Sequence, residues 1–555
     1  MSATSADAVA PLVAGRLADL LDGAVRRFPD ASAIDFLGRR TTYRELGDLV
    51  ERATVGFQHL GVTKGTRVGL FLPNTPYSVI AYFAVLKAGG TVVPYNPLYV
   101  EPEVRHQVRD SDTRIMLVLD LADHYRKVAA QLGGGSLEHI VVCPLAEAMP
   151  RLKGMAYALT SRGRRAVVPV DSHHSKFADL IARHESPGPV EVDFAAPAVL
   201  QYTGGTTGVS KAATLTHANL TVQVQQLVRW TPDFTYGGER VLGILPLFHV
   251  FAMSVVMLYA IAIGGEMILL PRLDIDMLMK TILRRRPTCV PGVPTLYTAI
   301  ATAAEKKGYD LSFIRICLSG GAPLPDEVRV RFEKLTGCVL VEGYGLSETS
   351  PVVTVNPPGD KGKPGSVGLP VAETIVEIRA IDETHRILPT GEKGEVCIRG
   401  PQVMAGYWNQ PDETANVMID GALRTGDVGY LDADGYLFLV DRLKDLIICS
   451  GFNVYPRMIE EALYRHPAVA EAAVIGLPDQ YRGEAPKAFV QLRPGATASA
   501  EEIKTFLSGQ ISKIEMPREI EFRDALPKSA VGKILRRSLA ADEAAKTKTS
   551  AGRAA

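Results

Sequence analysis

Short apolar runs alternate with segments of helical periodicity through the first two thirds of the chain. The runs at 67–72, 114–119 and 139–143 have the length of single strands, and 77–87 has the periodicity of a helix. Strands that are apolar along their whole length are buried on both faces, as in parallel sheets covered by helices. The pattern predicts an α/β fold built from layered, largely parallel sheets.

After residue 365 the pattern changes to strands punctuated by glycine. The segments 391–400 and 434–440 are examples, because each combines apolar strand residues with glycines that end or turn a strand. We therefore predict a smaller, β-rich subdomain in this part of the chain. Together with the preceding sheets it would complete a large N-terminal domain, residues 1–440.

The remaining residues have the pattern of a second domain, as expected for a chain of 555 residues. We expect a hinge at 441–445 and a small α+β domain at 446–540. The last segment, 541–555, is rich in Ala, Lys and Thr and lacks apolar periodicity, so we predict a disordered tail. Within the small domain, helices are predicted at 454–466 and 501–511, and strands at 468–475 and 488–492.

Charge and cysteine content argue against several classes of protein. The 61 basic and 61 acidic residues balance, which gives no support to a nucleic-acid partner. The six cysteines occur singly and without zinc-ligand spacing, as expected of structural thiols in a reducing compartment. Residues 1–20 lack the basic start and apolar block of a secretory signal, so we expect a cytoplasmic protein. The apolar stretch at 250–263 is shorter than the ~20 residues that span a bilayer and predicts a buried helix.

The segment Tyr202-Thr-Gly-Gly-Thr-Thr-Gly-Val-Ser-Lys211 follows an apolar run at 195–201. Glycines free backbone N–H groups to point inward, while hydroxyls and a lysine add donors and charge. These are the groups that a polyphosphate needs. We expect the segment to be a phosphate loop between a strand and a helix, and His217 or Asn219 could open that helix.

The loop does not have the spacing of a Walker motif. Gly204 and Gly208 are four residues apart, and Lys211 is followed by Ala212 instead of Ser or Thr. Ala212 would strain the backbone if its position required a positive φ. A flexible surface loop without a ligand is the alternative interpretation.

The loop and six later motifs resemble those of the adenylate-forming superfamily, which includes acyl-CoA synthetases, beetle luciferases and peptide-synthetase adenylation domains. The six motifs occupy 318–323, 342–349, 424–427, 441–445, 451–456 and 527–533. They occur in the family's order, and the resemblance extends from about residue 17 to residue 537. It implies a large N-terminal domain, a small mobile C-terminal domain, and the activation of a carboxylic acid by ATP.

The resemblance also implies an ATP site. The phosphate loop would contribute Thr203, Gly204, Gly205, Thr206, Thr207, Gly208 and Lys211. The wall around adenine would contain Gly320, Gly321, Ala322, Glu342, Gly343, Tyr344 and Gly345. Ser347 would donate to the α-phosphate, Asp427 would accept both ribose hydroxyls, and Arg442 would reach the ribose or a phosphate. Thr206 and Glu348 would hold Mg²⁺, a hard cation that prefers oxygen ligands.

Two lysines and one glycine receive roles by the same resemblance. Lys533, taken alone, could be a solvated surface charge; as the family's adenylation lysine it would neutralise charge between the carboxylate and the α-phosphate. Lys444 occupies the hinge, about which the C-terminal domain would rotate between two half-reactions. Gly451 would then face the active site and help to admit the thiol of coenzyme A.

The residues around His249 bear on the acid. By resemblance His249 lies at the mouth of the acyl pocket, although a core histidine with satisfied hydrogen bonds is the rival interpretation. An amino-acid substrate would need a carboxylate to pair its ammonium, and 250–254 contains none. This segment, the Gly-Gly-Thr-Thr-Gly form of the loop and 451–456 look most like bacterial long-chain fatty acyl-CoA synthetases.

Other substrates and partners stay open. The acid could be medium-chain, dicarboxylic or aryl, and the acceptor could be another molecule, or oxygen as in luciferases. The segment 149–165 carries five basic residues with apolar neighbours and no acid. Such a stretch can contact an anionic membrane or can simply be a solvated helix. A homodimer is also possible.

Overall fold

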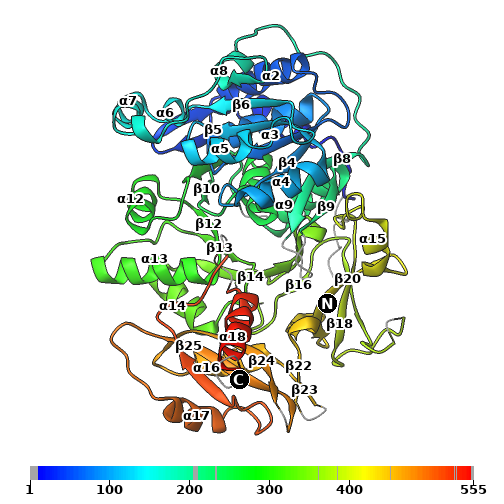
Figure 1. Ribbon diagram of the computed structural model, residues 1–555, viewed down its shortest axis with the longest axis vertical. Helices are drawn as coiled ribbons and strands as arrows, with labels where there is room; N and C mark the ends of the chain where they lie inside the picture. Colours follow the sequence, from blue (N-terminus) through cyan, green and yellow to red (C-terminus); the bar gives the residue numbers. More distant parts are fainter. Residues whose placement is uncertain are drawn as a thin grey trace, which may run out of the picture.

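The computed structural model describes residues 11–203, 210–231, 234–359, 362–383, 385–449, 452–479, 481–529, 532 and 534–551. The predicted site residues Gly204, Gly205, Thr206, Thr207, Gly208, Gly451 and Lys533 lie outside these ranges. Figure 1 shows two α/β layers in the upper part of the molecule, a β-rich subdomain beside them, and the C-terminal α+β unit below. The predicted fold class is therefore confirmed.

A seven-stranded sheet lies at the top of Figure 1. In spatial order it contains β7 (His174–Lys176), β6 (His139–Cys143), β5 (Thr113–Leu119), β3 (Arg67–Phe71), β4 (Thr91–Pro94), β8 (Pro197–Thr203) and β9 (Lys211–Thr216). All neighbouring pairs except β8 and β9 are parallel. The three strands and the helix predicted at 67–143 are confirmed as β3, β5, β6 and α3 (Pro76–Lys87).

The second large sheet has nine strands. In spatial order they are β16 (Leu369–Pro370), β15 (Val352–Val355), β14 (Val339–Gly345), β13 (Ile316–Ser319), β12 (Cys289–Gly292), β10 (Arg240–Gly243), β11 (Glu266–Leu269), β1 (Ser32–Phe36) and β2 (Arg39–Thr42). The pairs from β14 through to β1 are parallel, so the carboxyl ends of β12, β13 and β14 meet at one edge. Loops that leave this edge can therefore share one site.

Helices cover both large sheets. They include α1 (Asp19–Arg27), α2 (Tyr43–His59), α4 (Glu101–Ser111), α5 (Ala122–Ala129), α9 (His217–Trp230), α12 (Ile275–Arg285), α13 (Pro294–Lys307) and α14 (Asp326–Thr336), with the short α6 (Leu145–Ala148) and α8 (Phe177–Leu180). The predicted buried helix at 250–263 is confirmed as α10 (Val250–Ala252), a π-helical stretch (Met253–Leu258) and α11 (Tyr259–Ala262). Within the described ranges, none of the helices has the length and apolarity needed to cross a membrane.

The helix that His217 or Asn219 was expected to open is confirmed as α9 (His217–Trp230), but the sequence did not reveal the strand β9 between the loop and this helix. The loop joins β8 to the antiparallel β9, in which Lys211 pairs with Thr203 and Ala212 with Tyr202, and α9 begins only at His217. Thr216 caps that helix by accepting a hydrogen bond from the backbone N–H of Asn219. β8 and β9 thus form an antiparallel pair on either side of the loop. Ala212 is buried in extended backbone, so its Cβ causes no strain there.

The β-rich subdomain is confirmed as a five-stranded antiparallel sheet, with the short helix α15 (Pro411–Val417) in the chain between its strands β18 and β19. Its strands are β17 (Ile375–Arg379), β18 (Gly394–Arg399), β19 (Met418–Ile419), β20 (Ala422–Leu431) and β21 (Leu437–Arg442). The last of them runs directly into the segment 441–445, the proposed hinge. A single turn of 3₁₀ helix at Leu443–Asp445 forms most of that segment.

The C-terminal unit has its own apolar core, built around Ile459, Val474 and Val490. The elements predicted there are found as α16 (Pro456–Tyr464), β24 (Val469–Asp479), β25 (Gly483–Leu492) and α17 (Ala500–Ser508). The sequence did not predict the accompanying strands β22 (Ile447–Cys449), β23 (Phe452–Val454) and β26 (Glu519–Phe522).

The predicted disordered tail is wrong for most of its length. Helix α18 runs from Arg536 to Ala551. Leu539 on this helix is buried, and the carboxylate of Glu543 accepts from Lys487 Nζ at 2.8 Å. Alanine and lysine favour helices, and these tertiary contacts stabilise a helix too weakly amphipathic to be recognised in the sequence.

Candidate active site

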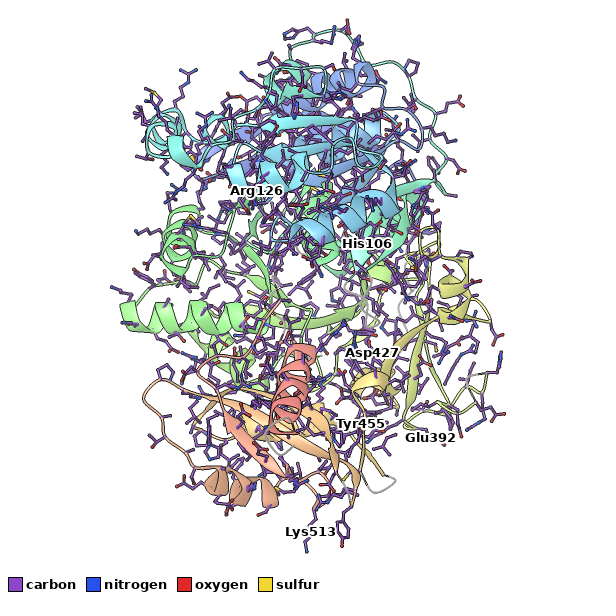
Figure 2. The ribbon with its side chains drawn as sticks, viewed as in Figure 1. His106, Arg126, Glu392, Asp427, Tyr455 and Lys513 are labelled. Atoms are coloured by element: carbon purple, nitrogen blue, oxygen red, sulfur yellow. The ribbon has the colours of Figure 1, made fainter. Side chains whose placement is uncertain are left out.

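The carboxylate of Asp427 lies where the β-rich subdomain meets the nine-stranded sheet. Asp427 on β20 is in register with Arg442 on β21, whose Nε lies 2.8 Å from Asp427 Oδ1. Tyr344 on β14 donates its hydroxyl to Asp427 Oδ2 at 2.6 Å. Figure 2 shows Asp427 near the middle of the molecule, above the C-terminal unit. An ionised carboxylate accepts about four hydrogen bonds, so Asp427 can hold these partners and still accept from a diol.

Two glycine-containing segments form a narrow wall beside Asp427. Gly320, Gly321 and Ala322 follow β13, and Glu342, Gly343, Tyr344 and Gly345 end the adjacent β14. A Cβ at Gly320 would lie 3.1 Å from the ring of Phe251, and one at Gly345 would lie 1.7 Å from the carbonyl oxygen of Pro351. A larger residue therefore does not fit at Gly345, and at Gly320 it would require the Phe251 ring to shift. The parallel register of β13 and β14 brings these predicted nucleotide-binding residues together, although 20 residues of sequence separate them.

Glu342 is a buried carboxyl at this wall. Its Oε1 accepts a hydrogen bond from the backbone N–H of Leu324 at 3.1 Å. Burial raises the pKa of Glu342 from 4.5 to about 7, against the opposing effect of the Arg457 guanidinium. Because Arg457 belongs to α16, the ionisation of Glu342 depends on the C-terminal unit as well as on the nucleotide wall.

We expect the Glu342 carboxyl to contribute a loss of stability as pH rises from 4.5 to about 7. In that range the unfolded chain loses the Glu342 proton while the native state keeps it, which lowers the free energy of unfolding by about 3 kcal/mol. Glu342→Gln should remove this pH-dependent loss of stability. For a large domain, the loss corresponds to about 3 °C in Tm. Thermal unfolding of both proteins across the pH range measures it. Parallel Tm curves would contradict the prediction.

The carboxylate of Glu348 is held by a tyrosine that the sequence analysis missed. Glu348 lies with Ser347 in a 3₁₀ turn, Ser347–Thr349, and its Oε1 accepts from the Tyr407 hydroxyl at 2.8 Å. The backbone N–H of Met404 donates to the Glu348 carbonyl at 2.8 Å. Only the aromatic pair Tyr407-Trp408 after a glycine could have marked this segment, and such pairs are common in cores.

Glu348 fits a hard cation, because a carboxylate can bind Tyr407 through one oxygen and a metal through the other. The other proposed metal ligand, Thr206, lies outside the described residues. Elsewhere in the described ranges, His, Cys, Asp and Glu do not gather in threes that could hold a metal ion. A metal at Glu348 would therefore need phosphate oxygens or water to complete its coordination.

The base of the phosphate loop is fixed by several polar contacts. Ser210 Oγ donates to the carbonyl of Thr203 at 2.6 Å, and His106 Nε2 lies 3.2 Å from the Ser210 carbonyl oxygen. Figure 2 labels His106 on α4, close to this strand pair. Lys211 forms an ion pair with Glu413 and lies 5.5 Å from the centre of the Tyr407 ring. A phosphate that binds Lys211 would have to compete with Glu413.

His249 lies in a segment that contacts β8 on one side and the nucleotide wall on the other. Its Nδ1 accepts from the backbone N–H of Phe251 at 3.2 Å and caps α10. The adjacent Phe248 carbonyl accepts from Gln201 on β8 at 3.1 Å. The ring of Phe251 packs on Gly320, as described above. His249 is half-buried at this junction, so capping explains its position and its role toward the acid stays a proposal.

The loop that carries Lys533 approaches the same wall from the C-terminal unit. A Cβ added to Gly532 would lie 2.9 Å from Thr295 Oγ1 and 3.2 Å from Val293 Cγ2. Val293 also lies beside Gly321, where an added Cβ would be 3.9 Å from Val293 Cγ1. An ion pair of 2.7 Å between Arg493 and Glu327 links the C-terminal unit to α14. Gly532, the residue before Lys533, is therefore at the site.

Lys444 lies on the proposed hinge, two residues from Arg442. Burial, and then the neighbouring Arg442 guanidinium, lower the pKa of Lys444. Asp427 has the opposite effect on Arg442, whose pKa it raises. The hinge segment thus joins directly onto the carboxylate–guanidinium pair of the site.

The glycine-containing ends of β13 and β14, the buried cluster of Asp427, Arg442 and Tyr344, and the paired strands β8 and β9 fit a nucleotide-binding enzyme of the adenylate-forming type. The chain belongs to the AMP-binding enzyme family, whose sequence profile matches residues 21–408. The profile of the AMP-binding enzyme C-terminal domain matches residues 458–533. The match includes the segment that carries Lys533.

Similar proteins include the long-chain-fatty-acid–CoA ligase of Bacillus subtilis strain 168, which is 43% identical over 539 residues, 96% of this chain and 95% of the relative. The ligase of the same description from Escherichia coli O6:H1 is 38% identical over 536 residues, 94% of each chain. A feruloyl-CoA synthase from an Amycolatopsis species is 35% identical over 512 residues, 92% of this chain and 96% of the relative.

Solved structures share the fold over nearly the whole chain. ATP-bound MatB from Rhodopseudomonas palustris has a TM-score of 0.80 and 29% identity, covering 94% of this chain and 98% of that one. The anthranilate CoA ligase AuaEII, in complex with anthranoyl-AMP, has a TM-score of 0.80 and 26% identity, covering 96% and 98%.

Proposed function

We propose that the protein is an AMP-forming acyl-CoA synthetase for medium- or long-chain fatty acids. It converts acid, ATP and coenzyme A to acyl-CoA, AMP and pyrophosphate through an acyl adenylate. The observation that carries this proposal is the cluster of Asp427, Arg442 and Tyr344 at the glycine-lined wall, which suits a nucleoside. The similarity to long-chain-fatty-acid–CoA ligases over nearly the full chain supports the choice of acid and acceptor.

In the first half-reaction, a carboxylate oxygen of the acid attacks the α-phosphorus of ATP and pyrophosphate leaves. Two anions must approach each other, so the protein acts mainly by positioning and by neutralising charge. Asp427 holds the ribose, Ser347 donates to the α-phosphate, and Arg442 and Lys533 supply positive charge. Mg²⁺, bound through Glu348 and Thr206, would neutralise phosphate charge.

In the second half-reaction, the thiol of coenzyme A attacks the acyl carbonyl and AMP leaves with the former carboxylate oxygen. The C-terminal domain would turn about Lys444 between the two steps, which moves Lys533 away and brings Gly451 toward the site. No acyl group is attached to the protein. The six cysteines are all free and buried, which is consistent with structural thiols in a cytoplasmic protein.

The segment behind His249 supports an acid without an amine. Val250, Met253 and their neighbours up to Leu258 are buried and apolar, and the hydroxyl of Ser254 is bonded to the Ser350 carbonyl at 2.7 Å. A buried ammonium would find no carboxylate in this stretch. An aliphatic chain would add to the apolar contacts at about 0.8 kcal/mol per buried CH₂.

A panel of acids tests the proposed substrate. Pyrophosphate release is measured with ATP and coenzyme A for fatty acids of increasing length, dicarboxylic acids and aryl acids such as ferulate. We expect kcat/KM to rise with chain length into the long-chain range. Faster turnover with an aryl or dicarboxylic acid would identify the alternative ligase, and turnover that needs no coenzyme A would identify another acceptor.

Helix α7 (Arg151–Thr160) supports peripheral membrane contact as part of the proposal. Leu152, Met155 and Leu159 point outward from it with exposed fractions of 82%, 65% and 63%. The opposite side is fixed, since Gly154 is buried with no room for a Cβ, which would lie 2.3 Å from the Ala146 carbonyl oxygen. Figure 1 shows α7 at the periphery of the upper layer. The three apolar side chains could face the protein interior only if α7 separated from α6.

Basic residues flank this apolar stripe and complement an anionic bilayer. Arg151, Arg162 and Arg164 are exposed, whereas Arg165 is turned toward Asp120, with its Nε 2.9 Å from Asp120 Oδ2. A fatty acid partitions into lipid, so an enzyme that rests on the bilayer is close to its substrate. We also propose that the protein forms a homodimer, independently of the membrane contact.

Liposome sedimentation tests the contact. Vesicles that contain phosphatidylglycerol should sediment the wild type, and neutral phosphatidylcholine vesicles should not. Neutralising Arg151, Lys153, Arg162, Arg164 and Arg165 together, or changing Leu152, Met155 and Leu159 to Ser, should weaken binding by about tenfold or more. Arg331→Gln, on the distant α14, is the control. Identical sedimentation of all proteins would refute the membrane contact.

A further inference from the structure

Arg536 is the first residue of α18 and follows the Lys533 loop by three positions. Its guanidinium contacts three carboxylates from different segments. Nη1 lies 2.9 Å from Asp445 Oδ2 and 3.4 Å from Asp441 Oδ1. Nη2 donates to Glu460 Oε2 at 2.6 Å, and Nε donates to Glu460 Oε1 at 3.0 Å. Arg536 therefore joins α18, the proposed hinge and α16.

Asp441 anchors the hinge end of this cluster. Its side chain is only 2% exposed, and it also accepts from the backbone N–H groups of Arg442 at 2.8 Å and Arg457 at 2.7 Å. Burial raises the pKa of Asp441, and Arg536 is the strongest influence that opposes this. The surrounding carboxylates raise the pKa of Arg536. Loss of the arginine would leave like charges together without compensation.

The other side of Arg536 is a tight hairpin. Lys528 and Ile534 form an antiparallel bridge, and the backbone N–H of Leu535 donates to the Pro527 carbonyl at 2.8 Å. Gly532, inside this hairpin, touches Thr295 at the nucleotide wall. A displacement of Arg536 would therefore also displace the loop that carries Lys533.

The hinge end leads to the nucleotide site. Asp441 and Asp445 flank Arg442, and Arg442 pairs with Asp427 at 2.8 Å. A chain of contacts thus runs from Asp427 through the side chain and backbone N–H of Arg442 to Asp441, and from Asp441 to Arg536. Neither the resemblance nor the relatives assign a role to this arginine.

We propose that Arg536 is a positioning residue that fixes the Lys533 hairpin to the hinge in the orientation for adenylation. The proposal rests on the two half-reactions of the proposed function. Arg536 acts through Lys533 and does not touch the reacting atoms. Its contribution is confined to the first half-reaction, because the second does not use Lys533.

Arg536→Ala in the full-length protein tests this role. We expect pyrophosphate release to fall by about 10²-fold, the effect of a small misplacement of a catalytic group. Thioester formation from supplied acyl-AMP and coenzyme A should stay at the wild-type rate. Arg536→Lys should recover part of the loss, since an ammonium keeps the positive charge but lacks the planar, five-donor geometry of the guanidinium.

Arg518→Ala is the matched control, because Arg518 forms a single exposed ion pair with Asp479 in the same domain and should leave both half-reactions unchanged. Asp445→Asn removes the charge of the nearer of the two hinge carboxylates that contact Arg536, and it should reproduce part of the selective loss even if Arg536→Ala folds poorly. Equal loss of both half-reactions would mean a merely structural role and overturn the proposal, as would no loss in either. Absence of acid-dependent pyrophosphate release in the wild type would instead overturn the proposed function.

Discussion

Lys533→Ala is expected to lower acid-dependent pyrophosphate release by about 10²–10³-fold, the loss typical of removing a group that stabilises transition-state charge. The lysine brings positive charge between the carboxylate and the α-phosphate, where two anions meet. Thioester formation from supplied acyl-AMP should be spared, since that step joins a thiol to a neutral acyl group. Rapid-quench measurement of the two half-reactions separates the effects.

Lys528→Ala is the control for this prediction. Lys528 lies in the same hairpin, but its ammonium pairs with Glu471 at 2.6 Å, within the C-terminal unit. Its loss should change neither half-reaction. Equal loss of both half-reactions in Lys533→Ala would contradict the division of labour assigned to this lysine.

Glu348→Gln should give the second largest effect. The change keeps the shape and the hydrogen bond to Tyr407 but removes the charge that a hard cation requires. We expect kcat to fall by about 10²-fold and the Mg²⁺ concentration for half-maximal activity to rise by about tenfold or more. Titration of activity with Mg²⁺ in a chelator-buffered assay measures both.

Tyr407→Phe tests the geometry behind the same prediction. It leaves the Glu348 charge but frees the carboxylate to turn, so we expect a smaller shift in the Mg²⁺ requirement, about tenfold at most. Glu392→Gln, an exposed glutamate on the rim of the β-rich subdomain (Figure 2), is the control. An unchanged Mg²⁺ requirement in Glu348→Gln would remove this residue from the metal site.

The shared edge of the nine-stranded sheet explains how distant motifs form one site. The carboxyl ends of β12, β13 and β14 lie side by side, so Val293, Gly320 and Tyr344 become neighbours. Asp427 reaches the same place from the antiparallel β20, and Gly532 reaches it from the C-terminal unit. The fold thus supplies a rigid nucleotide wall and a separate domain that carries the lysine.

The sequence predicted buried strands well, because a run such as 139–143 is almost entirely apolar and is stable only when it is buried. It did not reveal β9, whose Lys-Ala-Ala-Thr-Leu-Thr sequence begins with three residues that are depleted in strands. Pairing with β8 and burial decide its structure, and neither is visible locally. The helix at 536–551 was missed for a similar reason, since its contacts with Lys487 are distant in sequence.

The candidate site was predictable where a motif is contiguous and not where a partner is distant. Asp427, Arg442 and Tyr344 belong to motifs and are found in mutual contact. Tyr407 lies 59 residues from Glu348, and no periodicity or spacing connects them. The carboxylates around Arg536 were hidden in the same way, because a single arginine in a basic stretch indicates only a solvated surface.

Oxygen-18 tracing tests the central claim most directly. The protein is incubated with Mg²⁺, ATP, coenzyme A and a long-chain fatty acid that carries oxygen-18 in both carboxylate positions. The oxygen-18 content of each product is then measured by mass spectrometry. Adenylation followed by thioester formation requires that AMP carry one oxygen-18 for each acyl-CoA formed, with none in pyrophosphate. Unlabelled AMP, or oxygen-18 in an inorganic phosphate released with ADP, would contradict the acyl adenylate.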